Sequence, residues 1–486
     1  MGGIGKTALA VVLAHEWAPR FPDAQLGLDG FGTRTQPPPP SAAALLTQII
    51  TTFIGPDAAK ALPDDEATLK PIYHDLLHGR KVLILLDNAR DAAQAAPLIP
   101  PAGCALIITS RQSFMLGTTR PHDVGRLPDA DAFDLLREYH PALGDADAAE
   151  LARLCAGLPL ALRLAGAHLG LDAADAPDGG VAETARYIAR LKAGRLGTLD
   201  ADAPDAGEVT ITETLRLSED LLPPVEREAW RKLGVFTVPF DARAAAAIAG
   251  ADGEMLTRFL RRSLLERDGA DRHRLHRLHD LAADYARARL GEPALDDLRM
   301  AHARHFAEVG YETADLYLKG DVMGGLALFD RERAQIEATF AWLAARPDAA
   351  SATVLLDLVN AVVYTGDLRF HPRQRIAWLE AQLAAARLTG NRQAEGNALG
   401  NLGNAHAALG DARKAIELYE QALIIDREIG DRRGEANDLF NSAVALAQLG
   451  QRAEALARAE QAAEIFAAIE SPWAENARQL ADRLRA

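Results

Sequence analysis

The C-terminal part of the chain repeats itself every 40 residues, and this repeat constrains the fold more than any other feature. Leu409-Gly410-Asp411 is followed at that offset by Leu449-Gly450-Gln451. The other matches are Asn401 with Asn441, Ala415 with Ala455, Ala422 with Ala462, and the series Glu395, Glu435 and Glu475. Small residues at fixed helical positions let antiparallel helices approach closely, and stacked helix pairs bury one continuous face. The repeat therefore predicts an α-solenoid.

The repeats resemble tetratricopeptide repeats in a 40-residue form, and we place them at residues 351–486. An earlier, degenerate copy begins near Val354, and a last charged helix from Trp473 to Leu484 caps the stack. The resemblance implies a bound protein or peptide. Asn401 and Asn441 either face that peptide or satisfy neighbouring backbone groups, and a helical solenoid without a ligand is the plainer interpretation.

The first residues have the pattern of a phosphate-binding loop. Gly5-Lys6-Thr7 ends the motif Gly-x-x-x-x-Gly-Lys-Ser/Thr, although its leading glycine would precede Met1. Glycines let backbone N–H groups surround a phosphate, Lys6 reaches the β- and γ-phosphates, and Thr7 ligates Mg²⁺. A helix over 8–14 then points its N-terminus at the anion. The alternative is a glycine-rich tail in front of a helix.

Two apolar runs predict strands of a parallel sheet. The run 81–87 ends in Asp87, and the run 104–111 ends in Arg111. Continuous apolar runs are typical of strands buried on both faces, and ligands bind at their carboxyl ends. Asp87 would hold Mg²⁺ and Arg111 would lie near a γ-phosphate. The alternatives are a turn at Asp87-Asn88 and a surface ion pair for Arg111.

The order of motifs resembles the NB-ARC domain of the STAND class of P-loop NTPases over residues 1–290. The matching motifs are Gly2-Gly3-Ile4-Gly5-Lys6-Thr7, Leu85-Leu86-Asp87-Asn88-Ala89-Arg90-Asp91, Ile108-Thr109-Ser110-Arg111, Gly157-Leu158-Pro159-Leu160-Ala161 and Leu278-His279-Asp280. The resemblance implies ADP or ATP with Mg²⁺ as ligands. It also implies that Pro159 packs beside the adenine and that His279 contacts the β-phosphate of ADP, whereas a capping or core histidine is the commoner alternative.

These interpretations together define one set of expected site residues. Asp87 and Arg111 are the catalytic candidates, and Thr7 and Asp87 are the metal ligands. The nucleotide-binding candidates are Gly2, Gly3, Ile4, Gly5, Lys6, Thr7, Ala8, Pro159 and His279.

The chain departs from the family pattern in two places. Asn88 stands where the family often has a second acid, and an amide cannot act as a general base. We therefore expect at most a slow ATP hydrolase, with Asp91 as a weak alternative base. The strand before the loop is also absent. We expect it to lie between the strands that end at Asp87 and near Thr109, in a natural chain that starts upstream of Met1.

The remaining segments complete a multidomain, mainly α-helical fold. The predicted domains are a truncated α/β nucleotide core at 1–125, a small helical bundle with a loop-like acidic connection at 126–208, a winged helix at 209–290, a helical arm at 291–350 and the repeats. A net charge of -15 excludes a whole-chain basic footprint for nucleic acid. Two cysteines and no long apolar stretch favour the cytoplasm and no membrane contact.

The expected function is a signalling switch that is off with ADP and on with ATP. The ATP-bound form would form a homo-oligomer, and the repeats would sense a protein partner. One alternative is a transcriptional regulator whose DNA-binding domain lies upstream or is the winged helix, although we do not expect this chain to bind DNA directly. Another is a repeat scaffold with a degenerate nucleotide core.

Overall fold

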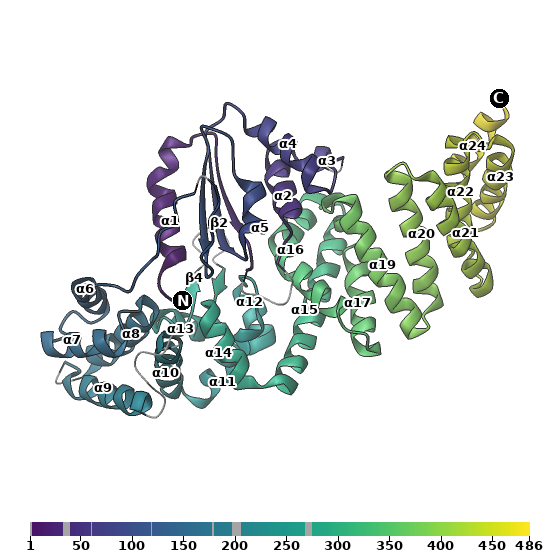
Figure 1. Cartoon of the computed structure of the whole chain (residues 1–486). Helices are drawn as coiled ribbons and strands as arrows, with labels where there is room; N and C mark the ends of the chain where they lie inside the picture. The colour runs from purple at the N-terminus through teal and green to yellow at the C-terminus, as the bar shows by residue number, and fades with distance from the viewer. Residues whose placement is uncertain are drawn as a thin grey trace. The chain divides into compact units, whose positions relative to one another are not determined.

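The computed structural model describes residues 2–32, 39–59, 61–117, 119–176, 179–196, 206–267 and 275–486. The chain is mostly helical and divides into two compact units, Met1–His302 and Ala303–Ala486 (Figure 1). The division falls inside the long helix α15 (Glu292–Leu318). The five-domain division of the sequence stays a prediction.

The first unit begins with a parallel sheet of three strands in the order β1-β2-β3. The strands are β1 (Ala24–Asp29), β2 (Val82–Ala89) and β3 (Ala105–Ser110). Helix α1 (Lys6–Trp17) packs on β2 and β3, while α2 (Ala42–Ile54) and α4 (Glu66–Leu77) cover the other face (Figure 1). The shorter elements here are η1 (Ala18–Arg20), α3 (Pro56–Ala59), α5 (Ala92–Ala95) and η2 (Ala96–Leu98). The two apolar runs are therefore parallel strands, as predicted.

The sheet pairs the two predicted strands directly and adds a third strand, β1. Leu83 to Leu86 of β2 pair directly with Ala105 to Ile108 of β3. In this chain the backbone groups on the facing edges of β2 and β3 therefore bind each other, and the place of a strand upstream of Met1 stays a prediction. Strand β1, which pairs in register with β2 on its other side, was not predicted. Its alternation of half-buried and exposed residues lacks the long apolar run that marked the other two strands.

Five helices follow the sheet and form a bundle. They are α6 (Asp129–Tyr139), α7 (Asp145–Leu154), α8 (Pro159–Asp175), α9 (Val181–Leu196) and α10 (Ala206–Asp220). Helix α9 corrects the expectation of a loop over 171–208. Its Tyr187, Ile188 and Leu191 are buried, so one apolar stripe packs the helix although the flanking composition is typical of loops. The part of the predicted connection at 197–205 lies outside the described residues.

The rest of the first unit combines helices with a two-stranded antiparallel ribbon. Its elements are α11 (Pro224–Lys232), η3 (Leu233–Val235), α12 (Ala242–Ala244), η4 (Ala245–Ala249), α13 (Gly253–Arg261), β4 (Glu266–Arg267), β5 (His276–Arg277) and α14 (Asp280–Leu290). Trp230 of α11 is fully buried, and its indole N–H donates to the carbonyl of Leu264 at 3.1 Å. Arg258 of α13 forms ion pairs with Glu226 and Glu254, so its charge is balanced within the unit.

The second unit is a stack of antiparallel helices, which confirms the predicted solenoid. It contains α16 (Val322–Ala344), α17 (Ala349–Ala361), α18 (Val363–Arg369), α19 (Pro372–Thr389), α20 (Arg392–Ala408), α21 (Ala412–Ile429), α22 (Arg432–Gln448), α23 (Arg452–Ala468) and α24 (Ala474–Arg485). The repeated alanines Ala415, Ala422, Ala455 and Ala462 all have zero exposure. Larger side chains at these positions would push neighbouring helices apart.

Two polar features lie inside the repeats. The buried carboxyl groups of Asp426 and Asp438 hydrogen-bond each other between α21 and α22, and burial raises the pKa of both. The Asn441 amide donates to Asn404 at 3.0 Å, so a neighbouring side chain satisfies part of its hydrogen-bonding capacity.

Within the described residues no single helix is long and apolar enough to cross a membrane. Only the bent pair α17 and α18, taken together, passes that test of length and composition.

Candidate functional site

The glycine loop before α1 is tightly packed. Gly3 and Gly5 have left-handed φ angles of 70° and 91°, which favour glycine. A Cβ atom on Gly3 would lie 2.7 Å from Cδ1 of Ile211, and one on Gly2 would lie 2.9 Å from Cδ1 of Leu281. The backbone N–H of Leu160 also donates to the carbonyl of Gly3 at 3.4 Å. Helices α8, α10 and α14 therefore all contact this loop.

The end of the loop connects to the central strand. The Thr7 hydroxyl lies 2.9 Å from Oδ1 and 3.2 Å from Oδ2 of Asp87, and donates to that carboxylate. Thr109 of β3 also donates to Asp87, and its hydroxyl accepts the backbone N–H of Asn88 at 2.8 Å. Burial and the nearby Arg111 lower the pKa of Lys6, against the opposing effect of Asp87. The structure thus brings the predicted lysine, threonine and aspartate together.

The start of α14 closes another side of this site. His279 is the N-cap residue, and its Nδ1 accepts the N–H of Leu281 at 3.2 Å. Burial lowers the pKa of His279, which favours the neutral ring that this acceptor role requires. Its neighbour Asp280 lies 3.5 Å from Arg111 in an ion pair. His279 thus caps the N-terminus of α14, while its contact with a phosphate stays a prediction.

The remaining predicted residues are placed around the loop. Pro159 begins α8, with its Cγ 3.7 Å from where a Cβ on Gly5 would lie. Ile4 is buried, whereas Ala8 is exposed in the first turn of α1. Asp91, the alternative base, instead caps α5 by accepting the N–H of Gln94 at 2.8 Å, and this bond lowers its pKa. A carboxylate with a lowered pKa is a weaker base.

The arrangement fits a nucleotide phosphate with Mg²⁺. Left-handed glycines precede a helix whose first turn has no acid, and Lys6 supplies a cation at the same end. The Thr7 hydroxyl and the Asp87 carboxylate place oxygen atoms next to each other, and oxygen is the ligand atom that Mg²⁺ prefers. Across the described stretches no group of three or more His, Cys, Asp or Glu could hold a metal. Thr7 and Asp87 would hold Mg²⁺ together with phosphate oxygens of the nucleotide.

Several residues of the site were not assigned by sequence reasoning. Thr109 and Asp280 stand inside recognised motifs, and their polar side chains beside the candidates could have suggested their contacts. Ile211 and Leu281 give no such signal, because an apolar residue on a helix predicts burial without showing which backbone it contacts.

Sequence comparisons relate part of the chain to a repeat family and part of it to a regulatory protein. Residues 376–468 match the family model of the tetratricopeptide repeat. Regulatory protein AfsR of Streptomyces griseus is 32% identical over 303 residues, which are 59% of this chain and 29% of that protein. AfsR of Streptomyces coelicolor is also 32% identical over 303 residues, 28% of its length. The chain thus spans less than a third of these curated relatives.

A solved structure also matches the chain. It is a Signal Transduction ATPase with Numerous Domains (STAND) protein with a tetratricopeptide repeat sensor, from Pyrococcus horikoshii. The match has 16% sequence identity and a TM-score of 0.39, and covers 99% of this chain and 82% of that one.

Proposed function

We propose that the chain is a regulatory switch of the NB-ARC type, which binds ADP in its resting form and ATP with Mg²⁺ in its active form. One observation carries the proposal: Lys6, Thr7 and Asp87 meet at the end of a glycine loop on a parallel sheet. The similarity to the regulatory protein AfsR supports a regulatory role. We propose that the repeats bind a protein partner and that the ATP form assembles into oligomers.

The two nucleotides would act through different contacts. Lys6 and the loop N–H groups bind phosphates in both forms, and Pro159 contacts the base. Arg111 is held by Asp280 of α14 in the present arrangement, so it would have to leave that ion pair to approach a γ-phosphate. A ligand can shift such an equilibrium only by binding one form more tightly than the other. Loss of the Arg111–Asp280 pair is therefore our proposed difference between the two forms.

We propose slow hydrolysis, so that exchange rather than turnover sets the state. Asn88 has no basic group, and Asp91 is used as a helix cap. Bound magnesium would supply charge neutralisation for the phosphates. In the chain itself, the hydroxyl groups of Thr7 and Thr109 orient the Asp87 carboxylate through their hydrogen bonds.

The test is titration with a fluorescent ADP analogue, with thermal unfolding followed in parallel. A ligand that binds only the folded form raises the melting temperature. The wild type should bind and Lys6→Ala should lose binding, while Lys70→Ala, at an exposed lysine of α4, should bind like the wild type. Equal binding by wild type and Lys6→Ala would refute the assigned loop. No binding by this chain and none by a chain extended upstream of Met1 would refute the switch and favour the repeat scaffold.

A further inference from the structure

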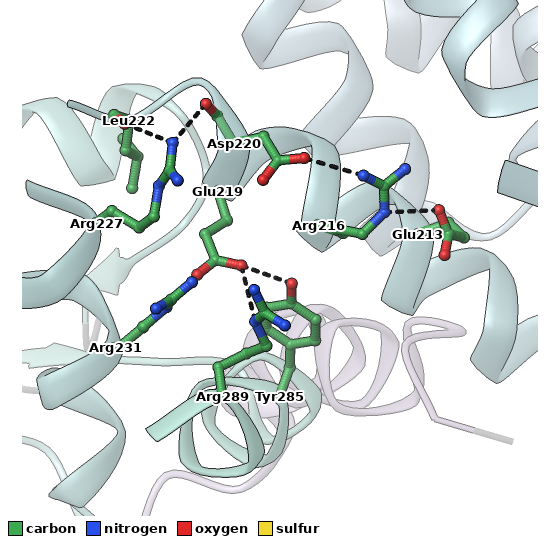
Figure 2. Close-up of polar contacts among 9 residues, drawn as sticks. All are labelled: Glu213, Arg216, Glu219, Asp220, Leu222, Arg227, Arg231, Tyr285 and Arg289. Atoms are coloured by element: carbon green, nitrogen blue, oxygen red, sulfur yellow. Dashed lines mark hydrogen bonds and ion pairs between the residues drawn. The ribbon is translucent and has the colours of Figure 1, made fainter. Parts of the chain in front are cut away.

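The first unit contains a fully buried carboxylate on a helix. Glu219, near the C-terminal end of α10, has zero exposure. A carboxylate removed from water destabilises the fold unless cations and hydrogen-bond donors surround it. Figure 2 shows that side chains from two other helices converge on it.

These partners join three helices at one point. Arg231 of α11 donates to one oxygen of Glu219. The Tyr285 hydroxyl of α14 donates to the other oxygen at 2.6 Å, and Arg289 of α14 lies 3.5 Å from it (Figure 2). Burial and the bond to Glu219 raise the pKa of Tyr285, so its hydroxyl keeps the proton that it donates. Nearby, Arg227 donates to the carbonyls of Asp220 and Leu222 and caps the end of α10.

Helices α10 and α14 also contact the glycine loop, through residues nearer to their N-terminal ends. Helix α10 presents Ile211 to Gly3, and α14 presents Leu281 to Gly2. Asp280, at the start of α14, holds Arg111. Helices α10 and α14 therefore connect the Glu219 cluster to both contacts with the loop.

We propose that Glu219 is a positioning residue that latches α14 to α10 and thereby holds the helix ends against the nucleotide loop. This inference rests on the proposed function and names the contact that must loosen before nucleotide leaves. The latch acts through helix position and not through contact with the ligand. Removing it should speed release of bound ADP and leave the rate of association nearly unchanged.

The experiment measures ADP release from the full chain by stopped flow with a fluorescent ADP analogue. Glu219→Gln keeps the shape and removes the charge. It should raise the dissociation rate constant by about tenfold or more, because weaker helix contacts with the loop loosen ADP that is already bound and leave its first encounter with the protein unchanged. Tyr285→Phe removes one hydrogen bond and should raise it less. The matched control is Glu213→Gln, because Glu213 pairs with Arg216 inside α10 alone, at 3.0 Å.

This measurement separates a latch from a merely structural role. A variant that only folds poorly lowers the amount of ADP bound and leaves the dissociation rate constant of the folded fraction unchanged. If Glu219→Gln and Tyr285→Phe release ADP at the wild-type rate, the latch is overturned. Equal acceleration by Glu213→Gln would overturn it as well.

Hydrogen exchange tests the latch in the absence of nucleotide. In Glu219→Gln and Tyr285→Phe, the backbone amides of residues 281–283 should exchange faster than in the wild type, with the amides of β2 as the internal reference. In Glu213→Gln the amides of residues 281–283 should exchange as in the wild type. If the wild type binds no ADP, release cannot be measured, and this exchange pattern alone decides the latch. Unchanged exchange at 281–283 in both variants would reject it.

Discussion

The buried pair of Asp426 and Asp438 makes the stability of the repeats dependent on pH. Both carboxyl groups are almost fully buried and hydrogen-bond each other, so one must carry a proton in the folded state. Burial, followed by the charge of Asp426, raises the pKa of Asp438 from 3.8 to about 8. We predict that Asp438→Asn stabilises the protein at neutral pH, because asparagine donates to Asp426 without taking up a proton.

The magnitude follows from proton linkage. Below pH 3.8 the group is protonated in both the folded and the unfolded chain, so it has no effect on stability there. As pH rises towards the folded value of about 8, only the unfolded chain releases its proton, and stability falls by ~1.36 kcal/mol per pH unit. Proton uptake therefore costs about 4 kcal/mol at pH 7, which is the upper limit of the gain from Asp438→Asn.

Urea unfolding followed by circular dichroism at pH 4, 7 and 8.5 measures this difference. The unfolding midpoints of variant and wild type should coincide near pH 4 and separate as pH rises, with the variant more stable. Glu464→Gln, at an exposed position of α23, is the matched control and should show no such separation. The reasoning is refuted if Asp438→Asn is no more stable than the wild type at pH 8.5.

Three glycine substitutions test how closely the chain packs. Gly403→Ala would place a Cβ 2.4 Å from Cε1 of the buried Tyr419, so it should destabilise the repeats by about 1–3 kcal/mol in chemical unfolding. Gly253→Ala in α13, with no atom within 4 Å, should be neutral or stabilising; similar losses in both variants would contradict this packing argument. Gly3→Ala would meet Ile211 at 2.7 Å with a φ of 70°, so it should weaken ADP binding and lower the melting temperature, and unchanged values of both would show that the loop adapts.

The sequence predicted those parts of the fold that follow from local pattern. The 40-residue period located the solenoid, because its alanines mark helix contacts and all proved to be fully buried. The apolar runs ending at Asp87 and near Arg111 located two strands. Strand β1 escaped prediction because it is half exposed, and α9 because acidic and glycine-rich neighbours concealed the stripe of Tyr187 and Leu191.

The candidate site shows the same limit. The glycines, Lys6, Thr7 and Asp87 belong to short motifs with fixed spacing, so their meeting could be predicted. Strand order gave no such signal, because it depends on chain crossovers that no local pattern records, so the place of the strand upstream of Met1 stays a prediction. Glu219 also gave no signal, since an acidic residue at the end of a helix is ordinarily solvated. Its burial depends on Arg231 and Tyr285, which come from distant parts of the sequence.

The repeat stack has a mechanical consequence. Helices α19 to α24 pack chiefly on their neighbours in sequence, with α20 also meeting α22. Such an array behaves as an elastic rod, because a small rotation at each junction adds to the next and changes the curvature of the whole. A ligand that spans several helices could therefore bend the array with little strain at any single contact, and the far end would move by the accumulated amount.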